Sequence, residues 1–226
     1  MFKEEGWDKA GVQEFWGDIA PCNHLVQIYE SEPVFMDTLE NFVISGLGSG
    51  EAVVLIATSA HLSALEARLE DKGFDLPSLK ADDQYIPFIA EVTLKKIVVN
   101  DWPDEALFNE LVSEIQSRAG KGKRKVRAFG EMVVLLWKQG KNEATIALEQ
   151  LWNKYLETNQ VTLFCAYPRA GFAGAGNDII QKICSTHTKI IDGSNHDHLH
   201  INYKDRTNGQ TLTNKILDAF NRTGKR

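Results

Sequence analysis

The carboxylate of Glu131 stands where a functional acid is expected in an open α/β sheet. Apolar and polar residues alternate over 126–129, Gly130 follows, and the apolar run 132–137 begins directly after Glu131. This pattern predicts a strand, a turn and a helix. Residues just past the carboxyl end of a strand face the ligand crevice of such a sheet. We therefore take Glu131 and Arg127 as candidate ligand-binding residues. The alternative is an ion pair that only stabilises the strand end.

Other reactive side chains lie on or beside further predicted strands. The apolar run 161–166 predicts a buried strand, and residues 24–29 alternate like another strand. Because parallel strands end at one edge of a sheet, we group their polar residues into one candidate ligand-binding site. Besides Glu131 and Arg127, the set contains His24, Tyr29, Glu30, Trp152, Cys165, Tyr167 and His187.

Two members of this set also have a purely structural interpretation. Cys165 lies inside an apolar strand, and its neighbours do not supply the positive charge that would activate a thiolate. Trp152 occupies an apolar position of the helix predicted over 143–157, which favours core packing, although it can also line a pocket.

The pattern HDHLH places His196, His198 and His200 at alternating positions. On a strand, all three imidazoles would point to one side and could bind zinc or another borderline metal. The spacing matches no established zinc signature, so we interpret this segment as a polar surface loop. We predict no metal and no cofactor.

Neither candidate phosphate-binding segment has the required form. The turn 29–33 lies between a strand and a helix, but it contains no glycine and carries Glu30 and Glu32, whose charges would repel a phosphate. The glycines of 46–50 follow a helix and precede a strand, so they predict a helix end. No GxxxxGK[ST] motif is present, and productive ATP hydrolysis is therefore not expected.

Strands and helices alternate along the chain, which predicts a three-layer α/β fold with a mainly parallel sheet and helices on both faces. We expect residues 22–205 to form one domain, preceded by an extension at 1–21 and followed by a helix and tail at 206–226. Residues 90–99 fit either a helix or a strand.

Composition limits the kinds of binding partner and the cellular compartment that we expect for this protein. A net charge of −6 argues against nucleic-acid binding through bulk electrostatics. The 3 cysteines include no CxxC pair, so a disulfide framework is not expected. Because the sequence contains neither a signal-peptide pattern nor a long apolar run, we expect a cytoplasmic protein without a membrane interaction.

Five motifs follow one another along the chain: H-x-V-Q-x-Y-E at 24–30, W-P-D at 102–104, R-x-F-G-E-M-V-x-L-L-W at 127–137, L-E-x-L-W-N at 148–153 and C-A-Y-P at 165–168. Together they resemble the MEDS family, the methanogen/methylotroph sensory domain. The resemblance implies a RecA-like core, similar to circadian-clock ATPases, that has lost its phosphate loop. It also favours a helix over residues 90–99.

For function, the resemblance implies a non-enzymatic sensory domain of bacterial signal transduction. Such a domain would bind a small ligand or a protein partner and relay the cue to a histidine kinase or a transcriptional regulator. A homodimer is a reasonable expectation. Two alternatives stay open: a residual nucleotide-binding or ATPase-like enzyme that uses Glu131 beside a metal ion, and a pure protein-interaction module.

Overall fold

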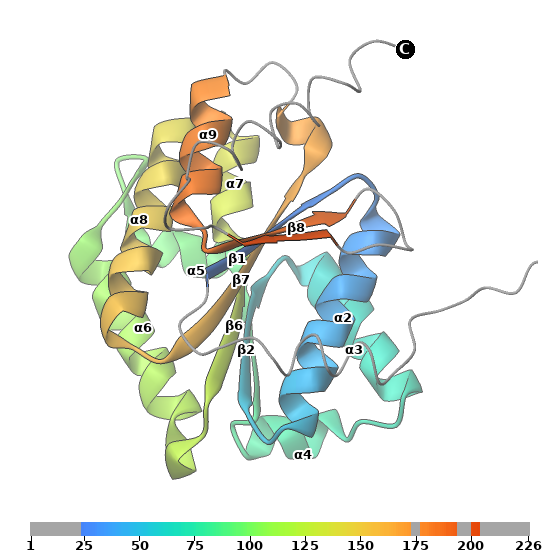
Figure 1. Ribbon diagram of the computed structural model, residues 1–226. Coiled ribbons are helices and arrows are strands. Elements are labelled where there is room, and N and C mark those ends of the chain that lie inside the picture. Colours follow the sequence, from blue (N-terminus) through green and yellow to red (C-terminus); the bar gives the residue numbers. More distant parts are fainter. Residues whose placement is uncertain (1–23, 173–176, 194–199, 204–226) are drawn as a thin grey trace, which may run out of the picture.

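The computed structural model describes residues 24–172, 177–193 and 200–203, and in this part of the chain a seven-stranded sheet forms the middle layer (Figure 1). The strand order is β3-β2-β6-β7-β1-β8-β9, and every neighbouring pair is parallel except the antiparallel pair β8 and β9. The strands are β1 (His24–Tyr29), β2 (Ala52–Ala57), β3 (Tyr85–Ile89), β6 (Val126–Gly130), β7 (Val161–Pro168), β8 (Lys189–Gly193) and β9 (His200–Tyr203).

Helices cover both faces of this sheet, which confirms the predicted three-layer α/β fold (Figure 1). One face packs against α2 (Glu32–Gly48), α3 (Ser59–Asp71) and α4 (Leu76–Ala81). The other packs against α5 (Ala90–Ile97), α6 (Glu105–Ala119), α7 (Met132–Lys138), α8 (Asn142–Thr158) and α9 (Asn177–Thr186). Because both faces are buried, the central strands are almost continuously apolar.

Alternation along β1 divides its side chains between the two cores. Leu25 packs in the core beneath α2 and α3, whereas Val26 packs in the core beneath α7 and α8. This follows from the strand geometry, in which successive side chains point to opposite faces. For the same reason, the side chains of His24 and Tyr29 point to opposite faces of the sheet. The two residues therefore meet different candidate residues.

Local signals explain most element boundaries. Thr58 is the N-cap of α3, and its hydroxyl accepts a hydrogen bond from the backbone N–H of His61. The expected helix end at 46–50 is confirmed: α2 stops at Gly48, and Gly50 has a φ of +71° before β2 begins. Two short 3-10 turns, η1 (Lys121–Lys123) and η2 (Arg169–Phe172), complete the connections.

The segment that fitted either a helix or a strand forms helix α5 and then β4 (Val98–Val99), which pairs with β5 (Trp102–Pro103) in a separate antiparallel ladder. Helix α4 and strands β8 and β9 were not predicted. The expected extension at 1–21, the expected helix and tail at 206–226, His196 and His198 lie outside the described residues. In the part that the structure describes, no helix is long and apolar enough to cross a membrane.

Candidate functional site

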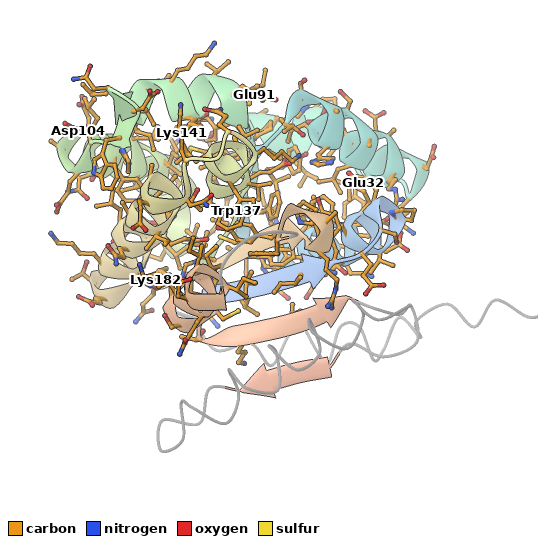
Figure 2. All side chains as sticks on the ribbon, turned by 90° about the horizontal axis from the view of Figure 1, so that it is seen from above. Glu32, Glu91, Asp104, Trp137, Lys141 and Lys182 are labelled. Atoms are coloured by element: carbon orange, nitrogen blue, oxygen red, sulfur yellow. The ribbon has the colours of Figure 1, made fainter. Side chains whose placement is uncertain are left out.

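Glu131 lies at the carboxyl end of β6, where its carboxylate meets the start of α3. Its Oε2 accepts a hydrogen bond from the backbone N–H of Thr58 at 2.8 Å and lies 2.9 Å from Nδ1 of His61. The Nε2 atom of His61 contacts Oε1 of Glu32, in the first turn of α2. We call the chain Glu131, His61 and Glu32 the strand-edge chain. It joins β6, α3 and α2, and Glu32 is labelled on α2 in Figure 2.

Solvent access increases along the strand-edge chain. The exposed fraction of the side chain is 4% for Glu131, 14% for His61 and 53% for Glu32. Phe35 packs beside it, with its ring centroid 5.1 Å from that of His61. Tyr29 stacks on Phe35 at 4.8 Å. A solute can therefore reach the carboxylate of Glu32 and part of the His61 imidazole, whereas the Glu131 carboxylate is buried.

The two acids control the protonation of their neighbours. Burial lowers the pKa of His61, but the hydrogen bonds and negative charges of Glu131 and Glu32 outweigh it, so the pKa is raised. Burial, with the charges of Glu32 and Glu131, raises the pKa of Tyr29 far above its ordinary value. The two acids therefore favour the protonated form of His61 and the neutral form of the Tyr29 phenol.

The contribution of His61 to stability is expected to depend on pH. Its folded-state pKa is raised above the ordinary value of 6.5, so the stabilisation is fully present below about 6.5 and is lost as pH rises through the raised pKa. We expect His61→Gln to lower the free energy of unfolding by about 0.5–1 kcal/mol at pH 5.5 and by clearly less at pH 8.5, because one partner is exposed. Urea denaturation at both values measures this. Equal losses at both values would show that folding does not raise the pKa of His61.

A second group of polar residues is buried on the opposite face of the sheet. It contains His24 at the start of β1, Cys165 in β7, Glu149 in α8 and His187 just before β8. One nitrogen, oxygen or sulfur atom from each lies within 4.8 Å of the others. We call these four residues the buried cluster. None of the four is more than 1% exposed.

Glu149 is at the centre of the buried cluster. Its Oε2 lies 3.3 Å from Nε2 of His24 and 3.9 Å from Sγ of Cys165. Its Oε1 lies 3.5 Å from Nε2 of His187 and accepts a 2.5 Å hydrogen bond from the hydroxyl of Tyr167. Both carboxylate oxygens are therefore in contact with polar partners, as a buried acid requires.

Burial and charge act on the pKa values in opposite directions here. Burial raises the pKa of Glu149, but the His187 and His24 imidazoles and the Tyr167 hydrogen bond outweigh it, so the pKa is lowered. Burial and the charge of Glu149 raise the pKa values of Cys165 and Tyr167 well above their ordinary ranges. The cluster as it stands therefore holds a carboxylate, a thiol and a phenol.

The outer nitrogen of each cluster imidazole has an oxygen partner. Nδ1 of His187 lies 2.7 Å from the carbonyl oxygen of Ile183, which can only accept a hydrogen bond. Nδ1 of His24 lies 2.9 Å from Oδ1 of Asn153, and the Asn153 amide nitrogen donates to the carbonyl of Thr186 at 2.8 Å. These partners place a proton on each Nδ1 atom and direct each Nε2 atom towards Glu149.

With the fold and both groups described, comparison with known proteins identifies the family. A model described as "MEDS: MEthanogen/methylotroph, DcmR Sensory domain" matches residues 23–188. The chain belongs to the MEDS family. No curated protein matches the chain. A solved structure titled "Structural study of Project ID PH0250 from Pyrococcus horikoshii OT3" is similar with a TM-score of 0.54 and 14% identity, covering 86% of this chain and 91% of that one. That similarity concerns the fold alone.

The residues predicted to form one ligand site lie in two separate places in this MEDS domain. Tyr29 and Glu131 lie at the strand edge, under α2 and α3. His24, Cys165 and His187 belong to the buried cluster on the α8 face, and the hydroxyl of Tyr167 contacts this cluster through Glu149. The prediction grouped residues by strand ends, but alternation along each strand sends their side chains to opposite faces of the sheet.

The remaining three predicted residues have other partners. The guanidinium of Arg127 pairs with Glu51 instead of Glu131, donates to the carbonyl of Phe42 at 2.9 Å and lies 5.1 Å from the Phe42 ring centroid. Glu30 pairs with Arg169 at 3.1 Å.

Trp152 packs edge-on against Phe108 at 4.9 Å, as its core interpretation predicts.

Three residues of these sites, Glu32, His61 and Glu149, are absent from the predicted set, and each had a signal in the sequence. Glu32 lies in the 29–33 turn, which was considered only for phosphate binding. His61 follows the end of β2 by four positions, so the rule that pointed to Glu131 also applied to the β2 end. Glu149 interrupts the apolar face of α8, one turn before Asn153, and a carboxylate on a buried helix face needs a partner. Sequence alone did not show that the partners are His24 and His187.

Proposed function

We propose that this MEDS domain is a non-enzymatic sensor that binds a small ligand at the strand-edge chain. The observation that supports this most directly is the contact sequence from Glu131 through His61 to Glu32. It connects a strand end with the first turns of two helices, and its outer members are open to solvent. Membership of a sensory-domain family supports a signalling role.

The charges at the strand edge favour a neutral or cationic ligand. Glu30 and Glu32 are both partly exposed, with side-chain exposures of 43% and 53%, and Glu131 lies beneath them. A triphosphate at this position would meet carboxylates where phosphate-binding proteins provide backbone amides and a lysine. Hydrogen-bond donors on a small ligand could instead replace His61 at Glu131 or Glu32.

A ligand of this kind would change the relation between α2 and α3. When it binds a carboxylate of the strand-edge chain, the His61 bridge between the two helices is weakened. The two arrangements must differ in ligand affinity, and typical couplings are about 1–3 kcal/mol. A separate histidine kinase or transcriptional regulator would bind the changed surface of α2, either directly or through a homodimer of this chain.

The first test is native mass spectrometry of the purified full chain, compared with its denatured mass. A discrete non-nucleotide organic adduct would identify the ligand and support the sensor. An adduct of ATP and Mg²⁺ would favour the residual nucleotide-binding enzyme instead. Subunits without any organic adduct, together with tight capture of a regulator, would favour an interaction module.

Glu131→Gln is expected to weaken ligand binding at least about tenfold with only a modest change in stability, because glutamine keeps the shape but removes the charge that His61 faces. The matched control is Glu66→Gln on α3. Glu66 pairs with Lys80 at 2.9 Å and does not belong to the strand-edge chain. Isothermal titration with the identified ligand and thermal melting check both. A large fall in melting temperature with unchanged binding would show that Glu131 is only structural.

A further inference from the structure

The four residues of the buried cluster are all of types that bind transition metals. Two imidazole nitrogens, a cysteine sulfur and a carboxylate oxygen converge from β1, α8, β7 and the segment before β8. Imidazole and thiolate suit zinc and related ions, and a carboxylate commonly completes such a set. The motifs considered in the sequence could not reveal this set, because its members lie at 24, 149, 165 and 187.

The spacing of the donor atoms fits a tetrahedral ion. Bonds of about 2.0–2.3 Å to a tetrahedral ion place its ligand atoms about 3.3–3.8 Å from one another. The measured separations are 3.3 Å from His24 to Glu149, 3.5 Å from His24 to Cys165, 3.9 Å from Cys165 to Glu149 and 3.5 Å from His187 to Glu149. The two remaining separations, from His187 to His24 and from His187 to Cys165, are no more than 4.8 Å. An ion can therefore enter among these atoms with side-chain shifts of up to about 1 Å.

The surrounding contacts have the form of an outer coordination shell. Metal-bound histidines usually donate the other ring N–H to an oxygen, which fixes the ring and its tautomer. His24 does so through Asn153, and His187 does so through the carbonyl of Ile183. The Tyr167 hydroxyl binds Oε1 of Glu149, which leaves Oε2 directed at His24 and Cys165.

We propose that the buried cluster is a binding site for Zn²⁺ or a related divalent transition-metal ion. On binding, the Cys165 thiol would lose its proton to solvent, so the thiolate and the Glu149 carboxylate together balance the two positive charges of the ion. A neutral assembly of this kind avoids the cost of burying an unpaired charge. With four protein ligands and no side chain open to solvent, the site is a closed, structural one.

The ion would connect four segments that are distant in the sequence. His24 begins β1, which also carries Tyr29 at its other end, and His187 links α9 to β8. Figure 2 shows α9, with Lys182 labelled, beside strands β1 and β8. This role is independent of the ligand proposed at the strand edge, because the two sites lie on opposite faces of the sheet.

The test uses the full chain, prepared metal-free with a chelator and refolded with one equivalent of Zn²⁺ or Co²⁺. We expect one ion per chain by elemental analysis and, with Co²⁺, the ultraviolet absorption of a cobalt–thiolate bond and the visible bands of a four-coordinate ion. Zn²⁺ is expected to raise the melting temperature by several degrees, since an ion that binds only the folded state stabilises it.

Cys165→Ser is expected to abolish the thiolate absorption and weaken Zn²⁺ binding at least about 100-fold. The matched control is Cys184→Ser, because Cys184 is also a buried free cysteine but does not belong to the cluster. It should retain one ion and the absorption. Tyr167→Phe, which removes only the outer hydroxyl, should weaken binding about 10–100-fold and keep the absorption.

Three results would overturn the proposal. They are a folded wild-type chain that takes up no stoichiometric ion after refolding, a thiolate absorption that disappears with Cys184→Ser but persists with Cys165→Ser, and equal Zn²⁺ affinity in wild type and Cys165→Ser. Circular dichroism of each sample establishes folding. If Cys165→Ser does not fold, Tyr167→Phe and the wild-type stoichiometry decide the question.

Discussion

Glu149→Gln is expected to lower the free energy of unfolding by about 3 kcal/mol, even when a chelator removes all metal. The Glu149 carboxylate faces the imidazoles of both His24 and His187 and accepts the Tyr167 hydrogen bond. An amide has no charge with which to interact with these imidazoles, and its NH₂ group would face Nε2 or the Tyr167 hydroxyl. Urea denaturation at constant pH, with the slope of the transition compared, measures the loss.

The control for this prediction is Glu143→Gln on the same helix. The side chain of Glu143 is 66% exposed and pairs with Lys182 at 3.7 Å, so its loss is expected to change stability by less than about 0.5 kcal/mol. If both substitutions lowered the free energy of unfolding by an equally small amount, the charge of Glu149 would contribute nothing to stability. The pKa of Glu149 would then not be lowered by its histidine neighbours.

Gly46→Ala is expected to lower the free energy of unfolding by about 2–3 kcal/mol, although alanine is the better helix former by about 1 kcal/mol. A Cβ atom at this position of α2 would lie 2.5 Å from Cδ and 2.7 Å from Nε of Arg127, and 2.9 Å from Cγ2 of Val53. Arg127 would have to move, and its buried contacts with Glu51 and the Phe42 carbonyl would be disturbed. Chemical denaturation measures the effect.

Gly130→Ala is the matched control, because an added Cβ there would be 3.9 Å from its nearest described neighbour, a methyl group of Leu163. We expect a change within about 0.5 kcal/mol. A Gly46→Ala variant as stable as wild type would show that Arg127 can leave its position freely. Arg127 would then be available for binding rather than held between α2 and the sheet.

Strand β1 links the two sites because it contributes a residue to each. Its first residue, His24, belongs to the buried cluster, and its last residue, Tyr29, stacks on Phe35 beside the strand-edge chain. The strand pairs with β7 on one side and β8 on the other, which holds its position in the middle of the sheet. The two sites therefore lie along one strand, one near each of its ends.

The sequence determined the architecture because the signals for it are local. Apolar alternation, the glycines at the end of α2 and the turn after Gly130 each act over a few residues. Apart from α4, β8 and β9, the order of strands and helices therefore followed, and with it the three layers. Family membership followed from motifs that are continuous in the sequence.

Only the tertiary structure decided which of the candidate residues meet. The order β7-β1-β8 brings His24 to Cys165 and His187, and the packing of α8 adds Glu149. Likewise, Arg127 contacts Glu51 because the sheet register places Arg127 beside Val53, near the start of β2. Strand order, register and helix packing depend on the whole chain folding at once, so no local pattern could show that the predicted single site is two sites on opposite faces of the sheet.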